Sequence, residues 1–221
     1  MERHEKLIDL SHTIFEGLVT YKGLPAPVIC DFLSREDSKA FYEPGTSFQI
    51  GKIEMVTNTG TYIDCPFHRF KDGKDLSEVG LDQFVDLEGI TIDARNTDVV
   101  DRSFFVNKEI RNKAVLVYTD WARNWNTATY FEGHPYLTAD AAAYLKDCQV
   151  KLVGIDSHNI DDTRHNSRPV HTTLLGNNIL IVEHLCNLGK LPETGYTFNA
   201  APPKFKGAGT FPVRAYARLG A

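Results

Sequence analysis

The sequence predicts one α/β domain in which several buried strands are joined mostly by loops and accompanied by few helices. Three observations lead to this prediction: the chain has 221 residues, short apolar runs recur along it, and only one segment has clear helical periodicity. A chain of this length forms one domain with a substantial core. We therefore expect a single domain over residues 1–221, since no repeat or linker divides it.

The first half of the chain has the composition of extended structure. KLIDLSHTI predicts a strand that enters a turn, and the prolines of GLPAPVICDFL exclude a helix there. TSFQIGKIEMVTNTGTYID is rich in β-branched and aromatic residues and predicts strand throughout, with Gly51 as a bulge or hairpin point. SEVGLDQFVDLEGITIDAR predicts a short helix followed by a strand.

The second half contains the clearest elements. TADAAAYLKDC predicts a helix, with Thr138 as its cap and an alanine-rich apolar face. The tail FPVRAYARL alternates as a strand does. Short apolar runs are typical of strands covered on both faces, and three occur: KAVLVYTDW, VKLVGID and NNILIVEHL.

Charge and composition exclude several classes of partner. The net charge is -5 and there is no basic run, which argues against nucleic acid and anionic membranes. No apolar stretch approaches the roughly 20 residues of a membrane-spanning helix, and the start MERHEKLIDLSHTI does not resemble a secretory signal. We therefore expect a cytoplasmic protein with a small-molecule substrate.

The four cysteines are far apart and form no CxxC pair, so reduced thiols are expected rather than a zinc finger or a disulfide framework. Cys65 lies within the most polar of the extended segments. Its alternatives are a nucleophile and a small buried filler, and the filler is favoured because buried free cysteine is common.

That segment, NTGTYIDCPFH, concentrates candidate site residues. Alternate residues of a strand share a face, which would place Asn58, Gly60, Tyr62 and Asp64 together, and His68 follows the proline that ends the strand. A carboxylate and an imidazole this close can share a divalent metal, or form a base and its orienting partner. The same spacing also fits turn chemistry with a structural histidine.

Two later residues strengthen the functional interpretation. The apolar run ILIV ends in Glu183, and a carboxylate there needs a partner or a metal unless it reaches the surface. His171 lies just upstream in the polar loop SRPVHTTLLG, where a loop histidine without function is the alternative.

These residues resemble the cyclase family, which includes bacterial kynurenine formamidase and isatin hydrolase. The family motif is H-x-G-T-H-x-D-x-P-x-H, and NTGTYIDCPFH keeps its Gly, Thr, Asp, Pro and last His. The resemblance extends over nearly the whole chain through IDLSHTI, GIDSHNID, HTTLLGNNILIVEHLCNL and GAGTFPVRAYA. It implies a barrel-like mixed β-sheet core, homo-dimers or tetramers, and metal-dependent hydrolysis of amide or lactone-type bonds in small, often aromatic substrates.

The resemblance also implies residue roles. Asp64, His171 and Glu183 match metal ligands, and His68 matches the general base or a further ligand. Asn58 and Tyr62 replace two ligand histidines; an amide offers only a neutral oxygen, and a phenol with a pKa of about 10 ligates poorly. We therefore expect one divalent metal, zinc or manganese, and loss of the second metal position.

Asn58 and Tyr62 can instead donate hydrogen bonds to an oxygen that develops charge, or only fill the vacated space. His158 either replaces a lost ligand or supports the site from behind, and the second role is favoured. Trp121 and Trp125 can stack on a planar substrate or form an oligomer interface. They follow Asp120, where the family usually has glycine, and this departure leaves the substrate class open.

The leading hypothesis is a hydrolase of C–N amide or lactone-type bonds that uses metal-activated water and His68 as general base. One alternative is a degenerate family member that binds a small ligand without hydrolysis. The other is a metal-free lyase or isomerase that uses His68, Tyr62 and Asp64 as acid–base groups.

Overall fold

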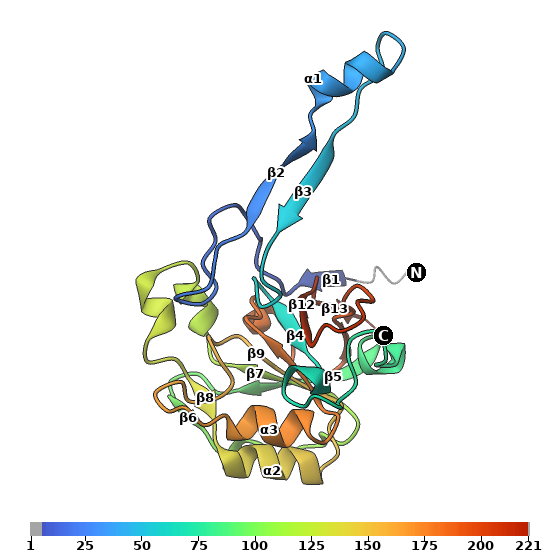
Figure 1. The fold of residues 1–221 in the computed structure, drawn as a ribbon. Coiled ribbons are helices and arrows are strands. Elements are labelled where there is room, and N and C mark those ends of the chain that lie inside the picture. The colour runs from blue at the N-terminus through green and yellow to red at the C-terminus, as the bar shows by residue number, and fades with distance from the viewer. Residues whose placement is uncertain (1–5, 221) are drawn as a thin grey trace.

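A nine-stranded mixed sheet forms the body of the protein in a computed structural model that describes residues 6–220. Its four middle strands are parallel to one another, and the outer strands pair antiparallel on both sides. The sheet curls into a half barrel (Figure 1). In sheet order the strands are β1 (Lys6–Asp9), β13 (Tyr216–Leu219), β11 (Tyr196–Asn199), β5 (Leu87–Asp93), β7 (Ala114–Tyr118), β9 (Leu152–Ile155), β10 (Leu180–Glu183), β4 (Tyr62–Asp64) and β12 (Thr210–Pro212).

This architecture confirms the predicted α/β class with a barrel-like mixed sheet. The three apolar runs form the central strands β7, β9 and β10, which are buried on both faces as their composition predicts. The strand β5 also forms where predicted, over Leu87–Asp93. One apolar cluster lies on one face of the sheet, and a second lies between the other face and the helices.

Three α-helices are present in the described residues: α1 (Arg35–Ser38), α2 (Ala139–Asp147) and α3 (Pro169–Leu175). The helices α2 and α3 lie side by side against one face of the sheet (Figure 1). Thr138 caps α2 as predicted, because its side chain accepts a hydrogen bond from the backbone N–H of Ala141. The short 3₁₀ turns are Lys39–Phe41, Pro66–His68, Leu81–Gln83, Arg102–Phe104, Trp121–Asn124, Ala128–Phe131 and Leu188–Lys190.

Two helical expectations were wrong. The helix expected before β5 is only the 3₁₀ turn Leu81–Gln83. Conversely, the polar segment expected as a loop forms α3, which begins with Pro169 and buries Val170, His171, Leu174 and Leu175. The segment was not recognised as a helix from its sequence, because it is polar and only one face of α3 is buried.

The long strand expected before Asp64 is also interrupted. The chain forms β3 (Ile50–Glu54), which pairs with β2 (Val28–Leu33) in a hairpin that projects from the body (Figure 1). The next strand, β4, begins only at Tyr62, because Gly60 has a φ of +67°. A side chain at Gly60 would come within 2.7 Å of Ile14, so glycine suits this turn by space and by conformation.

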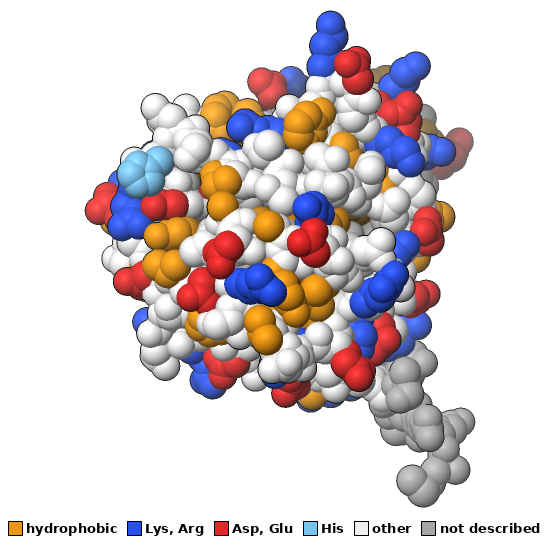
Figure 2. All heavy atoms as spheres, turned by 90° about the horizontal axis from the view of Figure 1, so that it is seen from below, with side chains coloured by type: hydrophobic (Ala, Val, Ile, Leu, Met, Phe, Trp, Pro, Cys, Tyr) orange, Lys and Arg blue, Asp and Glu red, His pale blue; other side chains and the backbone are white. Residues whose placement is uncertain are grey.

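The remaining sheet is a small pair of strands, β6 (Val99–Val100) and β8 (Tyr136–Leu137). On the face seen from below, acidic and basic side chains are interspersed with small apolar groups (Figure 2). Over residues 6–220, none of the helices has the length and apolarity needed to cross a membrane.

Candidate active site

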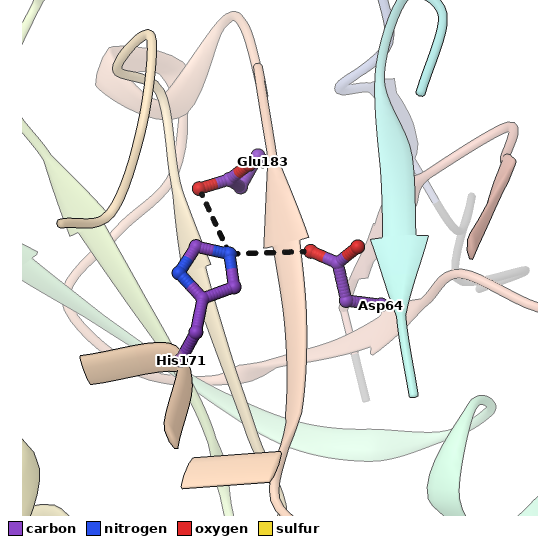
Figure 3. Close-up of side chains that lie close together, drawn as sticks. All are labelled: Asp64, His171 and Glu183. Atoms are coloured by element: carbon purple, nitrogen blue, oxygen red, sulfur yellow. Dashed lines mark ion pairs between the residues drawn. The ribbon is translucent and has the colours of Figure 1, made fainter. Parts of the chain in front are cut away.

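Three ionisable side chains converge at the boundary between the sheet and α3. Pairing of β4 with β10 places Asp64 opposite Ile181 and Tyr62 opposite Glu183, so Asp64 and Glu183 point to the same face. From α3, the His171 Nε2 lies 3.8 Å from Asp64 Oδ2 and 3.7 Å from Glu183 Oε1 (Figure 3). The three predicted metal ligands are thus brought together, with their ligand atoms within 4.8 Å of one another.

Asp64 is the least satisfied group of this cluster. It is fully buried, and neither carboxylate oxygen has a hydrogen-bond partner among the described residues. Burial, with the charge of Glu183 nearby, raises the pKa of Asp64 well above its usual value. A buried carboxylate without a partner is costly, and a cation at this point would remove that cost.

His171 is oriented by a residue that the sequence analysis did not identify. Its Nδ1 lies 2.6 Å from Asp161 Oδ2, which leaves Nε2 directed toward Asp64 and Glu183. Burial lowers the pKa of His171, but the hydrogen bond to Asp161 and the charges of Glu183 and Asp64 outweigh it and raise the pKa to about 9. A carboxylate on the far nitrogen fixes the tautomer and ring orientation of metal-binding histidines.

Glu183 is held on both of its oxygens. Oε1 accepts a hydrogen bond of 2.7 Å from the backbone N–H of Ile160, and Oε2 accepts from the hydroxyl groups of Tyr62 and, at 3.0 Å, Tyr21. Burial raises the pKa of both tyrosines well above the usual value, so they remain neutral phenols. Tyr62 therefore acts as a hydrogen-bond donor to Glu183, and its single proton is not available for a substrate oxygen.

The donor set fits a divalent cation. Asp64 offers two unpartnered oxygens, His171 offers an oriented Nε2, and Glu183 offers Oε1. Two carboxylates and one imidazole form a mixed N/O set that suits zinc or manganese, and three protein ligands leave a position open for catalysis.

A cavity of about 230 Å³ opens beside these ligands. His68 lines it from the turn Pro66–His68, with its ring centroid 6.0 Å from that of His171. Partial desolvation in the cavity, with His171 nearby, lowers the pKa of His68, which favours a neutral ring able to accept a proton near pH 7. The lining residues are Tyr21, Leu24, Asn58, Tyr62, His68, Arg69, Asn159, Arg168 and His171.

Asn58 reaches this cavity from the loop before β4 rather than from a strand. Its Oδ1 accepts a hydrogen bond of 3.0 Å from Thr210 Oγ1, whereas its Nδ2 has no hydrogen bond to the described residues. The amide therefore has a donor left for a bound molecule. The single-strand argument for Asn58 was wrong, although the residue does line the same cavity as Tyr62.

The two tryptophans are not among the residues that line this cavity. Trp125 stacks on His12 with ring centroids 4.1 Å apart, and Trp121 donates its indole N–H to the backbone oxygen of Tyr130. Their place favours packing behind the site over stacking on a substrate. Asp120 adopts a φ of +63°, a conformation that glycine adopts without strain, where the family usually has glycine.

His158 and Cys65 do not join the ligand cluster. The backbone oxygen of His158 accepts a hydrogen bond of 3.0 Å from Tyr21, and burial lowers the pKa of its ring to about 3. Cys65 is buried in the core, and burial raises the pKa of its thiol to about 11, so it is no thiolate nucleophile near pH 7.

Sequence reasoning missed Tyr21 and Asp161, which hold Glu183 and His171 in place. Tyr21 comes from a loop far from the motif, and no local pattern marks it. Asp161 lies in GIDSHNID, next to a predicted buried strand, and that place was a signal in its favour.

Comparison with known proteins adds independent findings. A family model described as "Putative cyclase" matches residues 8–162. A kynurenine formamidase of Bacillus cereus is 28% identical over 211 residues, which cover 96% of each chain. A solved structure described as a "potential metal-dependent hydrolase with cyclase activity" has 26% identity and a TM-score of 0.79, covering 98% of this chain and 99% of the other. Isatin hydrolase A from Ralstonia solanacearum shares the fold at 22% identity, with a TM-score of 0.81 over 98% of this chain and 92% of that one.

Proposed function

This chain belongs to the cyclase family, and we propose that it is a metal-dependent hydrolase of a C–N bond in a small, formamide-like amide, or of a lactone-type bond. The observation that carries the proposal is the buried carboxylate of Asp64, which has no hydrogen-bond partner among the described residues, beside the oriented Nε2 of His171. The similarity to a kynurenine formamidase over almost the full length of both chains supports the amide as substrate.

A divalent cation held by Asp64, His171 and Glu183 would supply Lewis acidity, which would polarise the substrate carbonyl and lower the pKa of water. His68 accepts the proton of the attacking water at its free imidazole nitrogen and returns it to the leaving nitrogen when the C–N bond breaks. The Nδ2 group of Asn58 donates a hydrogen bond to the carbonyl oxygen as negative charge develops there. Asp161 and Tyr21 act through the ligands, by holding His171 and Glu183 in position.

We propose a single ion, zinc or manganese. The hydroxyl groups of Tyr21 and Tyr62, 2.8 Å apart, both lie against Glu183 Oε2, and Tyr62 stands at the position of one of the replaced histidines. Neutral phenols that donate to a carboxylate satisfy it without a metal. Only the set of Asp64, His171 and Glu183 then remains to bind an ion.

The test joins metal analysis with hydrolysis of formanilide, the formamide of aniline. The purified protein, supplied with zinc or manganese in excess, should contain about one ion per chain by elemental analysis and release formate. Asp64→Ala should remove both properties, whereas Asn58→Ala should keep the ion and lower only the rate. A protein that releases formate without any ion would instead support the metal-free alternative, and one that binds the probe without turnover would support the binding protein.

We also propose that the chain assembles with copies of itself through the hairpin of residues 28–54. All residues of its strands except Leu33 are exposed, and α1 lies at its tip (Figure 1). A two-stranded hairpin is at best marginally stable alone in water, and this one exposes large apolar side chains on a projecting arm. These are Val28, Ile29, Phe32, Phe41, Tyr42, Ile50 and Ile53.

Sedimentation velocity tests this assembly. Phe32 and Phe41 are 76% and 72% exposed, and Phe32→Asp with Phe41→Asp should convert an oligomer into a monomer. Leu81, which is 70% exposed on the body, is the matched control, and Leu81→Asp should leave the mass unchanged. A monomeric wild-type protein, or arm variants with the wild-type mass, would show that the arm has another role.

A further inference from the structure

Two guanidinium groups line the candidate catalytic cavity. Arg69 and Arg168 are its only Lys or Arg residues, and no Asp or Glu is among the described residues that line it. The cavity volume of about 230 Å³ lies below the range usual for drug-sized ligands and suits a small substrate. Two arginines without a carboxylate in the lining of one cavity indicate a role in binding rather than ordinary surface charge.

The two arginines are tied to each other and to the catalytic elements. Arg69 directly follows His68, and its Nε donates a hydrogen bond of 3.2 Å to Thr172 Oγ1. The same hydroxyl donates a hydrogen bond of 2.8 Å to the backbone oxygen of Arg168. Arg168 directly precedes α3, which carries His171. One hydroxyl group thus joins the segment of the general base to the helix of a metal ligand and fixes both arginines beside the cavity.

Neither arginine is neutralised by a carboxylate among the described residues. Arg168 Nη1 donates to the backbone oxygens of His165 and Ser167, at 2.5 and 2.7 Å. In the same loop, Arg164 instead forms a pair with Asp162 at 2.9 Å. Backbone carbonyls position a guanidinium without cancelling its charge, so Arg168 retains its positive charge for another group.

We propose that Arg69 and Arg168 form a subsite for a carboxylate of the substrate, so that the preferred substrates are small aromatic amides that bear an anionic group. The inference rests on the proposed hydrolase function and adds the substrate class. Guanidinium groups match carboxylates in geometry and charge, and two of them beside one cavity bind an anion and orient it relative to the ion and His68.

The competing explanation is that both arginines only offset the negative charges of Asp64, Asp161 and Glu183. If that were their role, removing the arginines would change the metal affinity, and would change the turnover of charged and neutral substrates by the same factor. The two explanations therefore differ in the ratio of rates for substrates with and without a carboxylate.

The experiment compares formanilide with its three carboxylated isomers, 2-, 3- and 4-formamidobenzoate, on the metal-loaded protein. At least one isomer should have a kcat/KM about tenfold or more above that of formanilide, as expected for one charge-assisted hydrogen bond. In Arg69→Gln and Arg168→Gln this ratio should fall toward one, while the metal content remains that of the wild type. Arg168→Lys should retain part of the ratio, and Arg95→Gln, outside this cavity, should retain all of it.

Equal kcat/KM for formanilide and all three isomers would overturn the subsite. So would glutamine variants whose ratio stays at the wild-type value, or which lose metal together with all activities. If no probe is hydrolysed, the hydrolase proposal fails, and calorimetry with benzoate and benzamide tests the subsite by itself. The wild type should then bind benzoate more tightly than the double glutamine variant does, with benzamide affinity as the reference; equal benzoate affinity refutes the subsite.

Discussion

Asp161→Asn tests the orientation of His171 without changing any of the three proposed metal ligands. Asp161 Oδ1 accepts a hydrogen bond from the backbone N–H of Val170 at 2.8 Å, and Oδ2 accepts from the backbone N–H and Nδ1 of His171, at 3.0 and 2.6 Å. Asparagine has one oxygen and one NH₂ group in place of these two acceptors. If the NH₂ faces His171, the backbone N–H of His171 loses its acceptor, Nδ1 must become an acceptor, and the proton moves to Nε2, the nitrogen needed for the metal. If the NH₂ faces Val170, a buried backbone N–H loses its partner.

The magnitude follows from these alternatives. Loss of a group that orients a metal ligand costs about 10–100-fold in affinity, or about 1.4–2.8 kcal/mol. In either orientation one buried backbone N–H, that of Val170 or that of His171, loses its acceptor, which costs about 1–3 kcal/mol of folding stability. Asp161→Asn should therefore lower the free energy of unfolding in either orientation, and should weaken metal binding as well when the NH₂ faces His171.

Competition with a chromogenic chelator measures the affinity, and urea unfolding of the metal-free protein measures the stability. Asp162→Asn is the matched control, because Asp162 is the next residue but pairs with Arg164 outside the ligand cluster. It should leave metal affinity unchanged. If Asp161→Asn keeps both the affinity and the stability of the wild type, the orientation of His171 by Asp161 is refuted.

Three further changes test other parts of the site. Asn58→His combined with Tyr62→His should add a second ion by elemental analysis, since it frees Glu183 from one phenol; an unchanged ion count would show that these positions do not face the ligands. Gly209→Ala should lower kcat, because the new Cβ would lie 2.5 Å from the backbone nitrogen of His68 and displace the proposed base; wild-type kcat would contradict this. His158 has a pKa lowered to about 3 by burial, so between pH 6.5 and 3 only the unfolded state gains its proton and stability falls as the pH drops. Urea unfolding from pH 6.5 to 4 should show a shallower fall for His158→Gln, by up to about 1.4 kcal/mol per pH unit, and equal slopes would refute the buried neutral ring.

The sequence was sufficient to predict the site residues that lie on strands, Asp64 and Glu183. A buried apolar run that ends in Glu183 and a short motif strand that contains Asp64 both have a local signature, and β10 and β4 are neighbours in the sheet. Both carboxylates lie in buried strands, and a buried charge needs an ion or a hydrogen-bond partner. His171 was identified with the wrong local structure, because a seven-residue helix with one buried face has too few apolar residues to be recognised.

The groups that orient the ligands could not be predicted, because their role depends on contacts between distant segments. Tyr21 reaches Glu183 across 162 positions of sequence, and its loop has no periodicity that places it beside β10. The extended composition of residues 46–64 indicated strand correctly for β3. It could not indicate that β3 leaves the body in a hairpin, since that depends on what the hairpin contacts.

The departures of this chain from its family motif and its two cavity arginines are parts of one charge balance. Two histidines at positions 58 and 62 would offer ligands for a second cation, whereas the amide of Asn58 and the neutral phenol of Tyr62 are poor ligands. Two ligand carboxylates offset the charge of one divalent ion, so a one-ion site offers an anionic substrate no net positive charge. Arg69 and Arg168 restore positive charge to that cavity from its lining rather than from a second metal. The same reasoning predicts that the double histidine variant, once loaded with a second ion, should depend less on these arginines for carboxylate preference than the wild type does.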